Sequence, residues 1–130
     1  MVTLVRRAGS GVVLGAASAV ALALGGLLVL YQIAGIAVPD WAYHGLFGLG
    51  TIGIPVINGY RDGRFVTSVV AAAIGALPLA VAFAPSGPPE IHLTLGEILL
   101  KATGGASAVG VAVGGLVHGV GLAINRFGTA

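Results

Sequence analysis

The sequence has no cysteine and few charged residues. Charged side chains make up 8% of its 130 residues, whereas soluble domains carry about 25%. Six basic and four acidic residues cannot cover a globule of this size with polar groups, so a soluble domain is excluded. A disordered chain is excluded too, because disordered segments are polar and highly charged. The absence of cysteine excludes a disulfide framework and thiolate metal sites.

The chain is instead rich in apolar residues and glycine. Its hydrophobic fraction is 57% and it contains 23 glycines, and its mean hydropathy is +1.05. Four long runs between successive charged residues contain no charge, and each is long enough to form a membrane-crossing helix of about 20 residues. The runs are continuous rather than alternating, which favours helices over a β-barrel. We therefore predict one all-α domain, a compact bundle of four transmembrane helices at about residues 12–38, 41–58, 65–84 and 98–124.

Turn and cap residues separate the predicted spans. Pro39 interrupts the chain after the first span, and Asp40 is placed to cap the second helix. Residues 58–63 hold the turn dipeptides Asn-Gly and Asp-Gly, and residues 84–90 hold three prolines. Residues 94–97 match a capping box, which places the start of the fourth helix near residue 95.

Basic residues predict the orientation of the bundle. With four crossings, five arginines fall on one side and Lys101 is the only basic residue on the other. Basic residues are enriched on the inner side of membranes, so we expect both ends of the chain on the cytoplasmic or inner side. We expect the same arginines to contact anionic lipid. They are Arg6, Arg7, Arg61, Arg64 and Arg126.

Small residues recur at helical spacing in three of the predicted spans. Helices in lipid associate by close packing at such residues. One interpretation is that these rows seal the four-helix bundle. The other is that at least one row faces another protein, in a homo- or hetero-oligomer. The candidate packing residues are Gly11 and Gly15, then Ala72 and Ala76, and then Gly110, Gly114, Gly115 and Gly119.

The predicted spans contain few ionisable side chains. No Asp, Glu, Lys or Arg lies deep in any of them, which argues against a proton-coupled or cation-coupled transporter and against an intramembrane protease. His118 is the one titratable residue well inside a span, and it continues the row of Gly110 and Gly114. We expect a neutral imidazole that bonds a carbonyl or hydroxyl of a neighbouring helix. A proton relay or a cofactor ligand is the alternative.

These observations predict a non-enzymatic membrane component. No phosphate loop or nucleotide fingerprint is present, and we expect no catalytic residues, cofactor, metal or nucleic-acid partner. The leading interpretation is a small multi-pass protein of a cell or virion membrane, with a structural or accessory role as a subunit of a larger assembly, including a viral envelope. The alternative is an oligomeric channel or holin-like pore.

Overall fold

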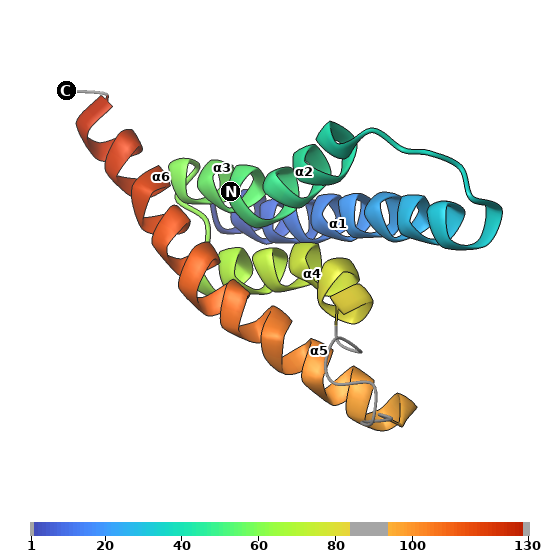
Figure 1. Cartoon of the computed structure of the whole chain (residues 1–130). Helices are drawn as coiled ribbons and strands as arrows, with labels where there is room; N and C mark the ends of the chain where they lie inside the picture. The colour runs from blue at the N-terminus through green and yellow to red at the C-terminus, as the bar shows by residue number, and fades with distance from the viewer. Residues whose placement is uncertain (1, 84–93, 129–130) are drawn as a thin grey trace.

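The computed structural model describes residues 2–83 and 94–128, and every element in these ranges is helical (Figure 1). The predicted proline-rich connection at 84–90 lies outside the described residues. The elements are α1 Val2–Val29 and η1 Leu30–Ala34; α2 Asp40–Gly48, η2 Leu49–Gly53 and α3 Ile54–Tyr60; α4 Phe65–Phe83; and α5 Leu95–Val109, η3 Gly110–Gly114 and α6 Gly115–Gly128. Of three short π-helical segments, η1 extends the end of α1, while η2 and η3 each join two α-helices without interrupting them, so the elements in these ranges form four continuous helices.

The first helix ends earlier than predicted. Gly35 takes a left-handed conformation with φ of 66°, and its N–H donates to the Tyr31 carbonyl at 3.2 Å. Glycine adopts this conformation without steric cost and commonly ends a helix. The helix therefore stops at Ala34 rather than at residue 38. The second helix is capped by Pro39, without a side-chain bond, and Asp40 is its first residue. The predicted cap at Asp40 is therefore wrong by one position.

The second and third long helices are joined by a tight turn. Asp62 has φ of 59°, in the left-handed region that aspartate tolerates better than most residues. The Asp62 N–H donates to the Gly59 carbonyl at 3.0 Å, and the Gly63 N–H donates to the Asn58 carbonyl at 2.8 Å. These bonds reverse the chain and place α3 and α4 side by side.

A side-chain cap defines the start of α5. The Glu97 N–H donates to Thr94 Oγ1 at 3.2 Å, and the Thr94 hydroxyl lies 3.2 Å from Glu97 Oε1. The Thr94 half of the capping box predicted at residues 94–97 therefore forms at the N-terminus of the helix, and the Glu97 carboxylate accepts from the Thr94 hydroxyl.

Helix α4 lies at the centre of the structure. It packs against α1, against the helix made of α2, η2 and α3, and against the helix made of α5, η3 and α6, which crosses the others obliquely (Figure 1). The core residues are small or medium-sized, and include Ala17, Ile54 and Ala71. Small side chains let helix backbones approach closely, which is the usual basis of helix packing in membranes.

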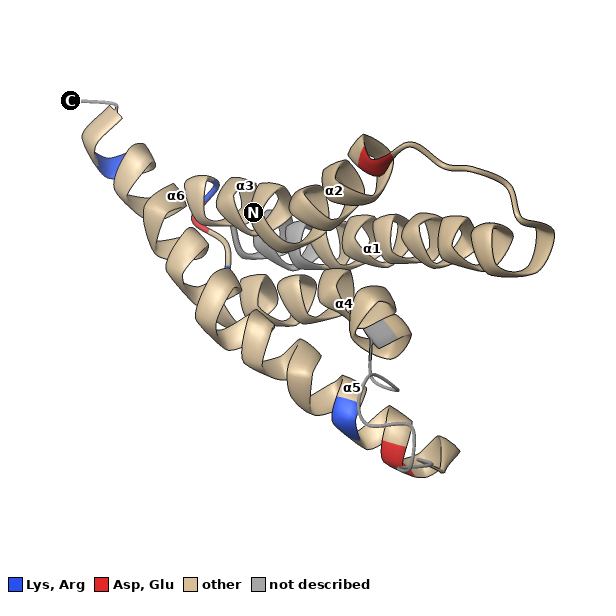
Figure 2. Cartoon of the chain, in the orientation of Figure 1, with Lys and Arg blue, Asp and Glu red and all other residues tan. Residues whose placement is uncertain are grey.

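Three helical segments are long and apolar enough to cross a membrane: Gly11–Ala34, Phe65–Ala82 and Leu95–Gly128. The helix at residues 40–60 is not among them, and it carries Asp40, His44 and Asn58. Large apolar side chains are exposed, among them Leu22 at 77%. Charged residues gather near helix ends and turns (Figure 2). This surface suits a bilayer, in which apolar side chains face lipid.

Candidate functional site

Three polar side chains from three helices meet in the interior. Asn58 lies near the end of α3, Ser68 in the first turn of α4, and His118 in α6. Their exposed fractions are 4%, 0% and 2%. We call them the polar cluster. Asn58 Nδ2 lies 2.8 Å from Ser68 Oγ, and Ser68 Oγ lies 2.6 Å from His118 Nδ1. The hydroxyl of Ser68 therefore bridges α3 and α6.

The donors present fix the direction of the bond between Asn58 and Ser68, whereas the direction of the bond to His118 depends on the imidazole tautomer. An amide nitrogen only donates, so the Ser68 oxygen accepts from Asn58. The hydroxyl hydrogen is then available for His118 Nδ1 at 2.6 Å or for the Pro55 carbonyl at 3.4 Å. If the hydroxyl donates to His118, the imidazole carries its proton on Nε2; if it donates to the Pro55 carbonyl, His118 Nδ1–H donates to Ser68 Oγ, which has a second lone pair.

The amide of Asn58 also ties the cluster to the α3–α4 turn. Its Nδ2 atom donates to the Arg64 carbonyl at 3.0 Å as well as to Ser68. A Cβ atom at Gly63 would collide with the Asn58 side chain. The turn therefore closes directly over the polar cluster, and only a glycine at residue 63 leaves room for the amide.

Close backbone contact between α3 and α6 holds His118 in place. A Cβ atom at Gly59 would lie 3.1 Å from the His118 Cα atom, and one at Gly121 would lie 2.7 Å from the Tyr60 nitrogen. The Asn125 side chain donates to the Tyr60 carbonyl. The Phe65 ring meets the imidazole edge-on, at 5.6 Å between centroids and 87° between planes. Apolar and backbone groups thus surround the cluster.

This arrangement suits helix association better than catalysis. A serine hydroxyl bonded to an imidazole resembles an activated nucleophile and its base. Here, however, Ser68 is fully buried and His118 is 2% exposed, so a substrate has no approach to the hydroxyl. Bonds between polar side chains of adjacent helices are a common means of fastening helices in a bilayer. Among the described residues, no group of three His, Asp or Glu side chains could hold a metal ion.

The predicted packing residues divide into two groups. Those in the first group are packed inside the structure. A Cβ atom at Gly110 would lie 2.6 Å from the Val69 carbonyl oxygen, and one at Gly114 would lie 2.7 Å from the Ala72 Cβ atom. Ala76 is 3% exposed, and a Cβ atom at Gly115 would lie 3.0 Å from the Phe65 ring.

The second group faces outward. Gly11, Gly15 and Gly119 are exposed, and a Cβ atom at any of the three would meet nothing within 4 Å. These three residues therefore do not seal the bundle, contrary to the interpretation that every small-residue row packs inside it. Sequence spacing alone could not separate the two groups, because both have the same helical period.

The arginines lie at helix ends. Arg61 and Arg64 are exposed in the turn before α4, and Arg126 is exposed in the last turn of α6. Arg6 and Arg7 belong to α1, and their side chains lie outside the part of the structure that is described. The beginning of α1, the α3–α4 turn and the end of α6 lie toward the same end of the structure (Figure 1).

Comparison of the chain with protein-family models, with curated proteins and with solved structures gives no match.

Sequence analysis missed two members of the polar cluster. It assigned residues 58–63 to a turn, and in the third span it named Ala72 and Ala76, but not Ser68, as packing residues. The available signal was their position: both lie within one helical turn of the same short connection. Polar residues that flank a tight turn between antiparallel helices are brought together by the turn itself.

Proposed function

We propose that the chain is a four-span membrane protein with a structural or accessory role, acting as a subunit of a larger membrane assembly. The observation that carries the proposal is the outward face of α1, where Gly11 and Gly15 have open space around them. Close helix packing in lipid uses such residues. Because no helix in the described part of the chain packs against Gly11 and Gly15, this face of α1 has room for a helix of another chain.

The polar cluster supports a non-enzymatic role. Its three side chains bond one another and the backbone of the α3–α4 turn. They are buried, so they are occupied in holding α3, α4 and α6 together. The deep interior of the spans contains no Asp, Glu, Lys or Arg, and His118 is its one titratable residue.

The helix at residues 40–60 supports a fourth span. Its three elements have nine, five and seven residues. At 1.5 Å per residue they cover roughly 30 Å, the thickness of the hydrocarbon core. Buried Thr51 in its middle donates to the Phe47 carbonyl of its own helix at 2.8 Å, so this hydroxyl needs no water. The arginines at helix ends then favour the inner side for both ends of the described chain.

The last helix fits this arrangement when it is tilted. Leu95–Gly128 has 34 residues and is about 50 Å long, whereas the hydrocarbon core is about 30 Å thick. A helix longer than the core tilts or extends beyond it. The oblique course of α5, η3 and α6 across the other helices is the arrangement that such a length requires (Figure 1).

The subunit role is tested by the mass of the complex. The protein is extracted from its native membrane in mild detergent, and the complex is weighed and its polypeptides identified. We expect a fixed stoichiometry with other chains, and we expect Gly11→Leu with Gly15→Leu to dissociate it. The matched control is Gly104→Leu, at another open glycine on a different helix, which should leave the mass unchanged. A monomer without partners would contradict the proposal.

An oligomeric pore is the alternative function. It rests on the same outward glycines, because a ring of identical chains also needs helix contacts. A homo-oligomer that carries ion flux in liposomes would favour it over the subunit role.

A further inference from the structure

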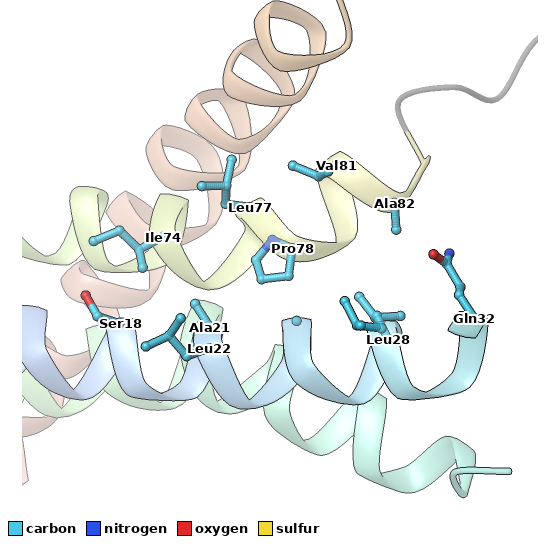
Figure 3. A pocket seen from close by; sticks show the side chains of 12 residues that line it. Ser18, Ala21, Leu22, Leu28, Gln32, Ile74, Leu77, Pro78, Val81 and Ala82 are labelled. Atoms are coloured by element: carbon cyan, nitrogen blue, oxygen red, sulfur yellow. The ribbon is translucent and has the colours of Figure 1, made fainter. Parts of the chain in front are cut away.

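A long groove separates α1 from α4 over their outer halves (Figure 3). Its volume is about 650 Å³. On the helix made of α1 and η1 it is lined at seven-residue spacing by Ser18, Gly25 and Gln32. On α4 its lining includes Ile74 and Pro78. Toward the other end the same two helices pack together, and Ala17 and Ala71 belong to one buried core cluster with Ile54. The groove therefore lies where α1 and α4 diverge from each other.

The lining is apolar with polar groups near its two ends. Among the described residues, none that lines it is charged. At one end the Ser18 hydroxyl donates to the Leu14 carbonyl of its own helix at 2.9 Å. At the other end the Gln32 side chain rises from η1 toward Ala82 near the end of α4 (Figure 3). A bound molecule would therefore contact an apolar lining and, at one end of the groove, the uncharged Gln32 amide.

The size of the groove limits what fits. From Ser18 to Gln32 it runs about 21 Å along the helix made of α1 and η1, at 1.5 Å per residue. A transmembrane helix of that length, about 10 Å in diameter, occupies roughly 1,600 Å³, more than twice the volume of the groove. A helix would therefore enter this open groove with only part of its cross-section, whereas a slender chain lies along it.

Both walls belong to helices that are long and apolar enough to cross a membrane. The open side of the groove then faces hydrocarbon, and the slender apolar molecules around it are lipid acyl chains. We propose that the groove binds one acyl chain of a membrane glycerolipid, with an ester carbonyl or headgroup hydroxyl of that lipid bonded to the Gln32 amide. This site needs α1 and α4 in the membrane, but it does not depend on the proposed subunit role.

Two adjacent glycines provide a matched test. Gly25 lines the groove, and Gly26 does not. A Cβ atom at either residue would meet nothing within 4 Å, so leucine is accommodated at both. Gly25→Leu places its side chain in the groove, whereas Gly26→Leu adds the same side chain to the same helix outside it.

The experiment is photo-crosslinking of the full chain in phosphatidylcholine vesicles. A fraction of the phosphatidylcholine carries a diazirine in its acyl chain, and adducts are mapped by mass spectrometry. In the wild type we expect adducts to be enriched on Leu28, Leu77 and Val81, relative to exposed Leu116 on α6. Gly25→Leu should lose this enrichment and Gly26→Leu should keep it. Gln32→Leu should reduce it, because the amide bond is lost.

Several results would overturn the proposal. One is an even distribution of adducts over groove and outward faces in the wild type, which indicates ordinary contact with the bilayer. Another is enrichment that survives Gly25→Leu, or that is lost equally in both glycine variants. A third is a change in complex mass in Gly25→Leu with unchanged adducts, which would assign the groove to a second protein chain. A monomeric wild type with enriched adducts would contradict the subunit role and leave the lipid site standing.

Discussion

Gly50 and Gly75 lie backbone against backbone where the helix at residues 40–60 crosses α4. A Cβ atom at Gly75 would lie 2.8 Å from the Gly50 carbonyl carbon, and one at Gly50 would lie 3.0 Å from the Gly75 Cα atom. Both glycines are buried. The separation of these two helices at their crossing is therefore set by two residues that lack side chains.

This contact predicts that Gly75→Ala destabilises the protein. The added methyl group forces the helices apart, and such overpacking costs about 1–3 kcal/mol. Reversible unfolding in mixed detergent micelles measures the change. The matched control is Gly104→Ala, in α5, where a Cβ atom meets nothing within 4 Å. There the higher helix propensity of alanine should stabilise the protein by roughly 0.5–1 kcal/mol. Equal effects at the two sites would show that the crossing is not close-packed.

The bond between Ser68 and His118 predicts energetic coupling. Ser68→Ala leaves two buried partners without their hydroxyl, and we expect it to lower the free energy of unfolding by about 1–3 kcal/mol. A double-mutant cycle with His118→Phe isolates the pair. Bonds between transmembrane helices average about 0.6 kcal/mol in such cycles and reach about 1.7, so we expect coupling in that range.

Ser18→Ala is the control for the serine substitution. Its hydroxyl bonds the Leu14 carbonyl of its own helix, and the residue is exposed. We expect a change within about 0.5 kcal/mol, as for most surface substitutions. If Ser18→Ala and Ser68→Ala cost the same, the cost of the second does not come from a bond between helices.

The sequence predicted where the helices lie better than it predicted what each helix face packs against. The uncharged runs predict four spans, and three of the helices are long and apolar enough to cross a membrane. Such runs are informative because the cost of burying charge in lipid is a property of the chain itself. The rows of Gly11 and Gly15 and of Gly110 and Gly114 have the same spacing, yet only the second row packs inside the structure. Periodicity defines one face of a helix, and tertiary contacts decide what that face meets.

The polar cluster shows the same limit. His118 was singled out because it was the one titratable residue well inside a span. Its partner Ser68 lies fifty residues earlier, and the sequence contains no pattern that pairs them. The contact between Ser68 and His118 depends on how α6 crosses α3, where Gly59 of α3 and Gly121 of α6 allow close approach. Such a crossing angle arises from the packing of whole helices.

The proposed four-span topology predicts which positions face outward. Because the chain has no cysteine, each single-cysteine variant carries one thiol. With four spans and inner arginines, a membrane-impermeant maleimide should label Asp40→Cys and Gly96→Cys in intact cells. Arg61→Cys should be labelled only after permeabilisation. All three positions are exposed, so burial does not decide the result. Labelling of Arg61→Cys from outside would contradict this topology.

The α3–α4 turn predicts a change in proteolysis. The Asn58 amide donates to the Arg64 carbonyl at 3.0 Å and fixes the end of the turn. Asn58→Ala removes this bond and the one to Ser68. A loss of about 1.4 kcal/mol for such bonds raises the population of the opened turn roughly tenfold. Trypsin should then cut faster after Arg61 and Arg64 in detergent-solubilised protein.

Two comparisons separate local opening of this turn from general unfolding. Cleavage after Arg126, exposed near the end of α6, should keep its wild-type rate in Asn58→Ala. Thr51→Ala removes another buried hydroxyl that bonds only a carbonyl of its own helix in the structure, and it should leave cleavage of the turn unchanged. An increase at all three arginines would mean that Asn58 stabilises the whole bundle and does not act on the turn alone. An unchanged rate at Arg61 and Arg64 would mean that the backbone bonds of Asp62 and Gly63 close the turn without the amide.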